Sequence, residues 1–356
     1  MKIMQVIPYF CFGGAEIMCE NLTYSLKNSG QDVFVVSLYH ERTPIARRME
    51  EAGIRIVYLD KKIGLDLSMV PKLTEIIRQE HPDVVHTHLD VIKYAVFAAK
   101  LTGVGKCVHT VHSLADREAE GRLQKLINGF YFRKAWSVPV ALTPEVQASV
   151  ADFYGLSTKR VPVIFNGIDL SRCVPKTDYE AEKTVRILHV GRFDIPKNHA
   201  GLLEAFRLLL EKRPQCRLYL VGDGDLRSDM EALAQEKGIA DAVEFCGMQS
   251  NVYPYLHDAD IFTLPSIYEG NPMTIIEAMG SGLPIVASRV GGIPDMISDG
   301  VSGILVDPEP QSICEGLARL VDDSSLRQRL GQMANVQSQA FSAEHMARDY
   351  IACYEN

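Results

Sequence analysis

Short apolar segments alternate with amphipathic segments along nearly the whole chain of 356 residues. Residues 3–7 and 33–38 have the length and the β-branched content of buried strands, whereas residues 15–28 repeat apolar side chains with the period of a helix. Strands that are separated by helices of about 10–15 residues form βαβ units. The pattern therefore predicts an α/β fold with mostly parallel sheets.

The alternation stops near residue 164 and begins again at residue 185. A polar, charged stretch with the composition of a linker, residues 171–183, lies between the two series. The chain is also more than twice the length of a typical domain. We therefore expect two doubly wound, Rossmann-like domains, residues 1–170 and 171–340, which face a central cleft. We expect residues 341–356 to form a helix that crosses back to the first domain.

Composition excludes several other classes of protein. Hydrophobic residues make up 47% and charged residues 23%, which is typical of a folded globular chain and not of a disordered one. No apolar segment reaches the ~18 residues of a transmembrane helix, and the apolar start of the chain is too short for a signal peptide. The eight cysteines include no CxxC pair, so we expect reduced thiols. These features predict a cytoplasmic protein.

Charge is unevenly distributed between the two halves. Residues 1–172 hold 21 Lys and Arg against 18 Asp and Glu, whereas the remainder holds 16 against 27. The segment 118–136 combines basic side chains with leucine and phenylalanine. Such a helix could lie on an anionic membrane, and a helix packed against its own domain explains the segment equally well. Both interpretations stay open at this point.

Two groups of residues mark predicted strand ends in the first half. Gly13-Gly14-Ala15-Glu16 begins a helix, where backbone N–H groups favour a phosphate, and a tight turn without a ligand explains the glycines about as well. Four histidines lie at the ends of two neighbouring strands, and we interpret them as hydrogen-bonded residues lining a cleft, not as metal ligands. They are His86, His88, His109 and His112. His112, just beyond its strand, is best placed to contact a ligand.

The second half carries two cations after its first strand. Gly191-Arg192 and Lys197 lie between the strand 185–190 and the next helix. An arginine can bind two oxygens of a diphosphate, and a lysine adds a point charge. Two cations at a helix start are otherwise unfavourable for the helix dipole, which favours the interpretation as an anion site.

The strongest local pattern is Glu269-Gly270-Asn271-Pro272-Met273, followed by Glu277 on the next helix. Gly270 frees the backbone to present N–H groups, and Pro272 is typical of a helix start. Carboxylates accept hydrogen bonds from neighbouring sugar hydroxyls. Because an unpaired carboxylate among apolar residues is costly, as for Glu277, we interpret both glutamates as ligand-binding residues.

Two Asp-x-Asp triplets, Asp223-Gly224-Asp225 and Asp258-Ala259-Asp260, have a spacing that can hold a divalent ion. The first lies in a turn where Asp225 can cap the following helix, and the second precedes a buried strand. Neither triplet adjoins the cations or the glutamates in the sequence. We therefore interpret both as structural and expect no metal and no other cofactor.

The order and spacing of these motifs resemble the retaining GT-B glycosyltransferases of family 4, in particular the bacterial capsular and exopolysaccharide enzymes. The similarity covers nearly the whole chain. Asn271 departs from the family pattern, which usually has a bulky apolar residue there, and the departure concerns contacts with the donor sugar. The further matching pieces are Val85-His86-Thr87-His88, Thr110-Val111-His112-Ser113, Asn166-Gly167-Ile168-Asp169, Val221-Gly222-Asp223-Gly224, the segment 278–287 and Gly291-Gly292.

The resemblance implies a role for each candidate residue. Arg192 and Lys197 would bind the donor diphosphate. Glu269 would hold the sugar hydroxyls and Glu277 the ribose hydroxyls, while His112 would approach the donor sugar near the reacting carbon. The remaining donor-binding residues that it implies are Gly14, Gly191, Met248, Gly270, Asn271, Pro272 and Met273.

The implied reaction transfers a sugar from a nucleotide sugar, expected to be a UDP-sugar, with retention of the anomeric configuration. The cationic pair would replace a metal, and the departing phosphate would take the acceptor proton. The acceptor would be a glycan or a lipid-linked sugar on the first domain, with peripheral membrane contact and no nucleic acid as partner. Three alternatives remain: a sugar-nucleotide epimerase, a phosphorylase, for which no pyridoxal lysine stands out, and a catalytically silent nucleotide-binding protein.

Overall fold

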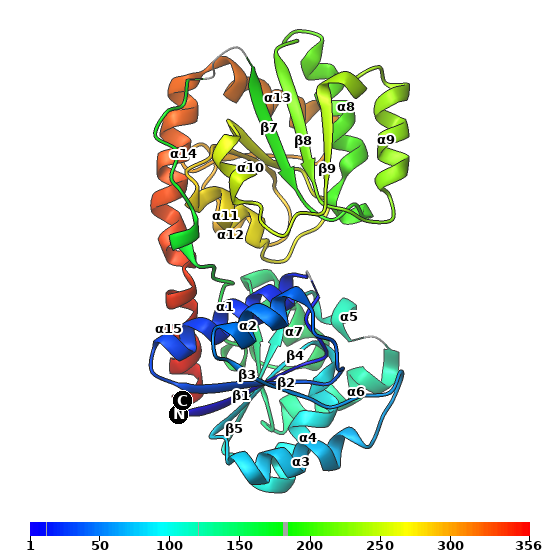
Figure 1. Cartoon of the computed structure of the whole chain (residues 1–356), viewed down its shortest axis with the longest axis vertical. Coiled ribbons are helices and arrows are strands. Elements are labelled where there is room, and N and C mark those ends of the chain that lie inside the picture. Colours follow the sequence, from blue (N-terminus) through cyan, green and yellow to red (C-terminus); the bar gives the residue numbers. More distant parts are fainter. Residues whose placement is uncertain (12, 120, 181–183) are drawn as a thin grey trace. The chain divides into compact units, whose positions relative to one another are not determined.

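A computed structural model gives the fold of the chain as two units, each built around a six-stranded sheet (Figure 1). Unit 1 is Met1–Gly167 with Ala343–Asn356, and unit 2 is Ile168–Ser342. The two doubly wound α/β domains expected from the sequence are thereby confirmed. Residues 181–183 of the predicted linker and residue 120 of the basic segment lie outside the described residues. The described ranges are 1–11, 13–119, 121–180 and 184–356.

The sheet of unit 1 grows in two directions from its centre. Its order is β3–β2–β1–β4–β5–β6, and its strands pair in parallel. Strands on opposite sides of such a switch point need crossover helices on opposite faces, because each crossover is right-handed. The loops after β1 and β4 therefore diverge at the carboxyl edge, where sheets of this type bind ligands. The strands are β1 (Lys2–Ile7), β2 (Asp32–Ser37), β3 (Arg55–Tyr58), β4 (Val84–His88), β5 (Lys106–Val111) and β6 (Val138–Ala141).

The helices of unit 1 follow from this winding. Helices α1 and α2 connect β1 to β3, whereas α3, α4 and α6 connect the strands up to β6. Helix α4 packs against both α3 and α6. The helices are α1 (Gly14–Asn28), α2 (Pro44–Glu51), α3 (Met69–Glu80), α4 (Ile92–Thr102), α5 (Ala115–Glu118), α6 (Gly121–Arg133), α7 (Pro144–Tyr154) and α15 (Ala343–Glu355).

The sheet of unit 2 has the same plan, with the order β12–β11–β10–β7–β8–β9. Its switch point lies between β7 and β10, so the loops after these two strands start side by side. The strands are β7 (Val185–Val190), β8 (Cys216–Val221), β9 (Val243–Gly247), β10 (Ile261–Leu264), β11 (Ile285–Ser288) and β12 (Ile304–Val306). The helices are α8 (His199–Leu210), α9 (Arg227–Glu236), α10 (Tyr253–Asp258), α11 (Met273–Gly280), α12 (Ile293–Met296), α13 (Pro310–Asp322) and α14 (Ser324–Ser338).

Some local predictions were wrong. The apolar pattern predicts a last strand of the first half at residues 161–164. These residues are not a strand, and Val163 forms a single parallel bridge with Ala141. The sequence pattern also missed α2, α7, α13 and α14. The starts of α2 and α7 could have been predicted from the sequence. Thr43 and Thr143 are the N-caps of these helices, and the first residue of each helix is a proline.

The last helix, α15, belongs to unit 1, although it follows unit 2 in the chain. The hydroxyl of Tyr354 lies 2.7 Å from Nδ1 of His86, and Nε2 of His86 lies 2.8 Å from Oγ1 of Thr110. Tyr350 completes the network at 2.7 Å from Thr110. These side chains are buried, and burial lowers the pKa of His86 well below its usual range. The network thus joins α15 to β4 and β5 through uncharged groups.

Within the described part of the chain, no helix combines the length and the apolar character needed to cross a bilayer.

We predict that Tyr354→Phe lowers the free energy of unfolding of unit 1 by about 1–3 kcal/mol, because it leaves a buried imidazole nitrogen without its partner. Urea denaturation followed by circular dichroism measures this change. Tyr9→Phe is the control, since Tyr9 is 37% exposed and its hydroxyl can be solvated, so its effect should be near zero. Equal stability of the two variants would contradict the proposed anchoring role of the network.

Candidate active site

An ion pair joins the two loops at the switch point of unit 2. Nζ of Lys197, after β7, lies 2.5 Å from Oε1 of Glu269, after β10. The same carboxylate oxygen accepts a hydrogen bond of 2.7 Å from the hydroxyl of Ser266. Glu269 is only 7% exposed, so solvent screens this pair less than a surface salt bridge. Two residues 72 positions apart are thus brought together through Oε1 of Glu269, and its Oε2 can accept from a ligand.

Arg192 is the most available cation of this site. It lies two residues after the end of β7, its side chain is exposed, and its guanidinium forms no ion pair with any described residue. Across the switch point, α11 begins at Met273 with no side-chain cap on its first N–H groups. A free guanidinium and open helix N–H groups are both suited to an anion such as a diphosphate.

Two glycines allow the backbone of this site to pack closely. A Cβ on Gly291, which has φ of 55°, would lie 1.7 Å from the carbonyl oxygen of Glu269. A Cβ on Gly222 would lie 2.0 Å from the carbonyl oxygen of Gly191. Gly291 therefore packs against the loop that carries Glu269, and Gly222 packs against the loop that begins at Gly191. A larger residue at either position would displace the loop that it contacts.

Glu277 lies half-buried on α11, beneath the segment that enters unit 2. Burial raises the pKa of Glu277 to about 7, and the guanidinium of Arg172 is the charge that opposes this rise. Arg172 stacks on the ring of Tyr253 at 4.5 Å, which fixes its position. Glu277 is therefore a carboxyl group that changes charge near neutral pH.

His189, on β7, is a site residue that the sequence pattern missed. Its Nδ1 lies 3.0 Å from the carbonyl oxygen of Thr263. A carbonyl only accepts, so Nδ1 carries the proton and Nε2 holds a lone pair. Burial lowers the pKa of His189 to about 4, and a Cβ on Gly191 would lie 2.8 Å from Nε2. The sequence feature that could have indicated His189 is its position two residues before Gly191.

In unit 1, a hydrogen-bond chain fixes the tautomer of His112. Nε2 of His112 lies 3.1 Å from Nδ1 of His88, whose Nε2 lies 2.6 Å from Oε1 of Gln5. Because the amide oxygen accepts, His88 is protonated on Nε2 and its Nδ1 accepts from His112. Nδ1 of His112 then holds the lone pair that can accept from a ligand hydroxyl. Burial lowers the pKa of His112 to about 4, so the ring is neutral.

Glu118 holds the residues around His112, and sequence reasoning did not identify it. Its Oε2 accepts from the backbone N–H groups of His112 at 2.5 Å and Ser113 at 3.2 Å, while Oε1 lies 3.1 Å from Nε2 of His109. Glu118 lies in an ordinary charged stretch of sequence, so no spacing signal marked it. It acts as a positioning residue for the end of β5.

Gly14 is the first residue of α1, as predicted, and a carboxylate already lies at this helix start. Oε1 of Glu16 accepts a hydrogen bond of 2.9 Å from the thiol of Cys11. A Cβ on Gly13 would lie 2.4 Å from Oε2 of the same group. Burial raises the pKa of Glu16 and so favours the neutral form of its carboxyl group. The neutral form repels a phosphate near Gly14 less than the carboxylate does.

The other predicted donor-binding residues occupy two places in unit 2, the end of β9 and the loop before α11. Met248 follows β9 and is 62% exposed. Asn271 is buried, and its Nδ2 contacts Sδ of Met296 on α12 at 3.1 Å. Pro272 is the N-cap of α11, which begins at Met273. The backbone of Gly270 accepts from the N–H of Gly292 at 3.1 Å.

The Asp-x-Asp triplets make structural contacts. Asp260 accepts from the backbone N–H of Arg186 and pairs with Lys176 at 3.2 Å. Asp223 pairs with Arg227 at 3.5 Å. The expected cap from Asp225 was wrong, because Leu226 occupies the N-cap of α9 without a side-chain bond. Among the described residues, no group of three or more His, Cys, Asp and Glu is arranged to hold a metal ion.

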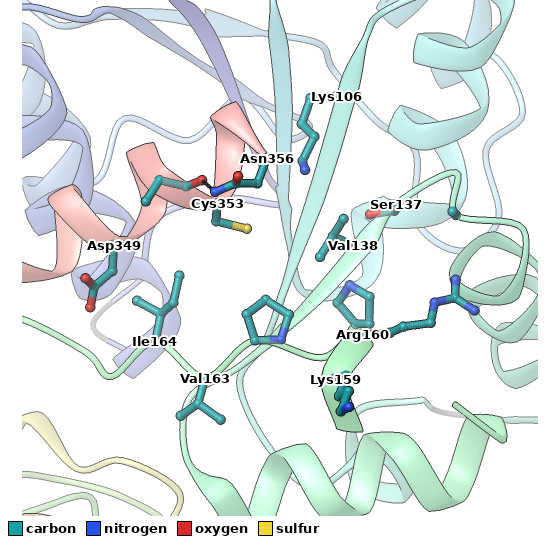
Figure 2. Close-up of a pocket in the computed structure, with 14 residues that line it drawn as sticks. Lys106, Ser137, Val138, Lys159, Arg160, Val163, Ile164, Asp349, Cys353 and Asn356 are labelled. Atoms are coloured by element: carbon teal, nitrogen blue, oxygen red, sulfur yellow. Dashed lines mark hydrogen bonds between the residues drawn. The ribbon is translucent and has the colours of Figure 1, made fainter. Parts of the chain in front are cut away.

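A separate cavity of about 510 Å³ lies in unit 1 (Figure 2). Lys106 and Val138 line it, and they are the first residues of β5 and β6. The cavity therefore lies at the amino edge of the sheet, whereas His112 follows the carboxyl end of β5. None of the predicted site residues lines it, so it is not the predicted site.

Two family models match the chain, one in each half. The model described as Glycosyltransferase Family 4 matches residues 12–172, and the model described as Glycosyl transferases group 1 matches residues 176–337. The "Lipopolysaccharide core biosynthesis glycosyltransferase LpsE" of Rhizobium meliloti is 30% identical, over 76% of this chain and 75% of its own length. The chain belongs to the family 4 glycosyltransferases.

This glycosyltransferase is also similar to proteins with more specific descriptions. An Escherichia coli "UDP-Gal:alpha-D-GlcNAc-diphosphoundecaprenol alpha-1,3-galactosyltransferase" is 28% identical, over 73% of this chain and 72% of its own length. The crystal structure of Anabaena Alr3699/HepE in complex with UDP is 18% identical, covers 100% of both chains and has a TM-score of 0.85. The structural likeness supports the GT-B fold expected from the sequence.

We predict that Gly291→Ala in this glycosyltransferase weakens UDP binding at least tenfold, because its Cβ would displace the loop that carries Glu269. Gly300→Ala is the matched control. Gly300 also has a positive φ, of 71°, but a Cβ there meets nothing within 4 Å. Both variants carry the same backbone cost of about 1 kcal/mol, so calorimetric titration with UDP isolates the steric effect. Equal affinities of the two variants would show that the loop does not depend on Gly291.

Proposed function

We propose that this glycosyltransferase transfers a sugar from a UDP-sugar to a lipid-linked glycan in the synthesis of a cell-surface polysaccharide, with retention of configuration and without a metal. The observation that carries the proposal is the Lys197–Glu269 pair beside the free Arg192 at the switch point of unit 2. These groups combine cations for a diphosphate with a carboxylate for sugar hydroxyls. A donor with both parts is a nucleotide sugar.

The cations take the role that a divalent ion has in other sugar-transfer enzymes. Arg192 binds two oxygens of the diphosphate bidentately. Lys197 donates a hydrogen bond to the diphosphate from one ammonium N–H while another keeps its bond to Glu269. The open N–H groups at Met273 add the positive end of α11. As the bond between the anomeric carbon and the phosphate oxygen breaks, this cluster stabilises the charge on the leaving diphosphate.

Retention follows from attack on the face from which the diphosphate leaves. The acceptor oxygen bonds to the anomeric carbon, and its proton passes to the departing phosphate oxygen. Glu269 orients the sugar through Oε2 and does not act as a nucleophile, since Lys197 and Ser266 hold its other oxygen. His112 accepts from a sugar hydroxyl through Nδ1, which is why its tautomer matters. Catalysis by positioning needs both groups to be fixed in advance.

A lipid-linked acceptor is supported by the description of the Escherichia coli relative, which names a diphosphoundecaprenol substrate. The description of the Rhizobium meliloti relative names lipopolysaccharide core biosynthesis, which supports a cell-surface glycan as the product. A cytoplasmic protein that uses such an acceptor must work at the membrane surface. We therefore include peripheral membrane contact through unit 1 in the proposal.

We predict that the purified protein releases UDP from one UDP-sugar in the presence of excess EDTA, and that Arg192→Ala lowers this rate about 100-fold. Arg186→Ala is the matched control, because Arg186 lies on the same strand at the opposite edge of the sheet. A panel of UDP-sugars with a diphosphate-linked acceptor names the donor, and nuclear magnetic resonance of the product gives the anomeric configuration. Loss of turnover with EDTA would overturn metal independence, and release of an altered nucleotide sugar without acceptor would indicate an epimerase.

We predict that UDP affinity depends on the charge of Glu277. Because burial raises its pKa to about 7, the carboxylate that accepts from the ribose hydroxyls is lost as pH falls. The dissociation constant of UDP should then rise about tenfold per pH unit below about 7 and level off above it. Glu277→Gln controls for titration of the UDP phosphate itself, which both proteins share. Parallel pH profiles of the two proteins would contradict this role of Glu277.

A further inference from the structure

The cavity at the amino edge of the unit 1 sheet is formed by segments that lie far apart in the chain (Figure 2). They are the start of β5, the turn that leads into β6, the segment 159–164 and the last turns of α15. Its volume of about 510 Å³ is large enough for a small organic molecule. Because His112 lies beyond the opposite end of β5, the cavity is a separate surface for a ligand.

Three cationic side chains border the cavity. Lys106 is the first residue of β5, and Lys159 and Arg160 follow α7 in the chain. The ammonium groups of both lysines form no ion pair and no hydrogen bond with any residue that the structure describes. The one acidic side chain of the lining is Asp349, which pairs with His345 on its own helix at 3.6 Å. The lining side chains therefore have an excess of positive charge, which favours an anion.

The end of α6 holds Arg160 in place. Nη2 of Arg160 donates to the carbonyl oxygen of Phe132 at 2.6 Å and to that of Arg133 at 3.4 Å. These bonds use one nitrogen of the guanidinium group and leave Nε and Nη1 to donate to a ligand. A guanidinium that is fixed in advance loses little freedom when it binds two oxygens of an anion.

The deeper part of the lining is apolar, whereas the cations are more exposed. Pro139 and Ile164 are buried, and Lys159 and Arg160 are exposed. Cys353 adds its thiol to the apolar part. Burial raises the pKa of this thiol, and the nearby ammonium group of Lys106 opposes the rise. A ligand that suits this lining therefore has an anionic group and an uncharged organic part.

One buried polar group of the lining lacks a partner. Ser137 is 2% exposed, and its hydroxyl oxygen forms no hydrogen bond with any described residue. Figure 2 shows this oxygen in red on the side of Ser137 that is turned toward Val138. A buried hydroxyl group without a partner is costly, because it has lost its bonds to water. An acceptor oxygen of a bound molecule would supply the partner.

We infer that the cavity binds a small organic phosphate. Its phosphoryl oxygens contact Lys106, Lys159 and Arg160, because several cations and a guanidinium with free N–H groups match a dianion with three oxygens. Its organic part packs on the apolar lining. The ligand contacts both α15 and the sheet, so it stabilises unit 1 by mass action. The inference is independent of the proposed function, since it concerns the edge of the sheet opposite to His112.

Alkylation of Cys353 by iodoacetamide, followed by mass spectrometry of its peptide, tests the inference on the full chain without donor or acceptor. The probes are fructose 1,6-bisphosphate, glucose 6-phosphate, adenosine monophosphate and inorganic phosphate. We expect at least one organic phosphate to slow the alkylation about fivefold or more at saturation, because it covers the thiol and neutralises the charge of Lys106. Inorganic phosphate should protect less, since it lacks the part that packs on the apolar lining.

Cys314 in unit 2 is the internal control, because it is half-buried as Cys353 is and does not line the cavity. Its rate of alkylation should stay the same with every probe. Failure of all the probes to protect Cys353, or equal protection of both cysteines, would overturn the inference.

Variants then test the contacts, with protection compared to the unprotected rate of the same variant. Lys106→Gln/Lys159→Gln should raise the concentration that gives half-protection about tenfold or more, because it removes two of the cations. Lys62→Gln/Lys134→Gln is the matched control, since it removes two exposed lysines of unit 1 that do not line the cavity. Equal weakening by both pairs would show that the probes respond to net charge only, and the inference would fail.

Ser137→Ala separates a ligand contact from a structural role. It should raise the concentration that gives half-protection about threefold, because the bound phosphate loses one hydrogen bond. The melting temperature of the ligand-free variant should equal or exceed that of the wild type, since the change removes a buried hydroxyl group that has no partner. A lower melting temperature with unchanged protection would contradict the contact with Ser137.

Discussion

The salt bridge between Lys197 and Glu269 depends on a reversal of strand order, not on any local motif. Strands β7 and β10 are neighbours in the sheet, although 70 residues lie between the end of β7 and the start of β10, and their following loops start side by side. Because the two strands are adjacent and parallel, both loops begin at the same edge of the sheet. The cations, the carboxylate and the open end of α11 all depend on that single topological feature.

Neutral and buried groups support the charged ones. His189 beneath the first loop and His112 in unit 1 are kept uncharged by burial, each with one nitrogen committed to a fixed partner. Gly291 and Gly222 lie where a Cβ would clash with the carbonyl oxygen of a neighbouring loop. The site residues therefore have few alternative positions, which is what a reaction catalysed by positioning requires.

The sequence predicted elements and residue types better than it predicted partners. The two sheets, Lys197, Glu269 and His112 could be found because strand periodicity and motif spacing are local properties. Their bonds could not, since Lys197–Glu269 and Gln5–His88–His112 connect residues far apart in the chain. Glu118 and His189 were missed because a single acid in a charged stretch and a histidine in a strand carry no pattern. The basic segment was ambiguous because both of its interpretations need the same residue types, and only exposure separates its buried Tyr131 and Phe132 from its exposed leucines.

The assignment of α15 to unit 1 has a consequence for synthesis on the ribosome. Unit 2 is one continuous stretch of chain, Ile168–Ser342, whereas unit 1 needs a helix that is translated after all of unit 2. The nascent chain therefore contains every residue of unit 2 before it contains every residue of unit 1. During that interval His86 and Thr110 lack the tyrosines that they contact in the finished protein. The first domain in the sequence is thus the last to be completed.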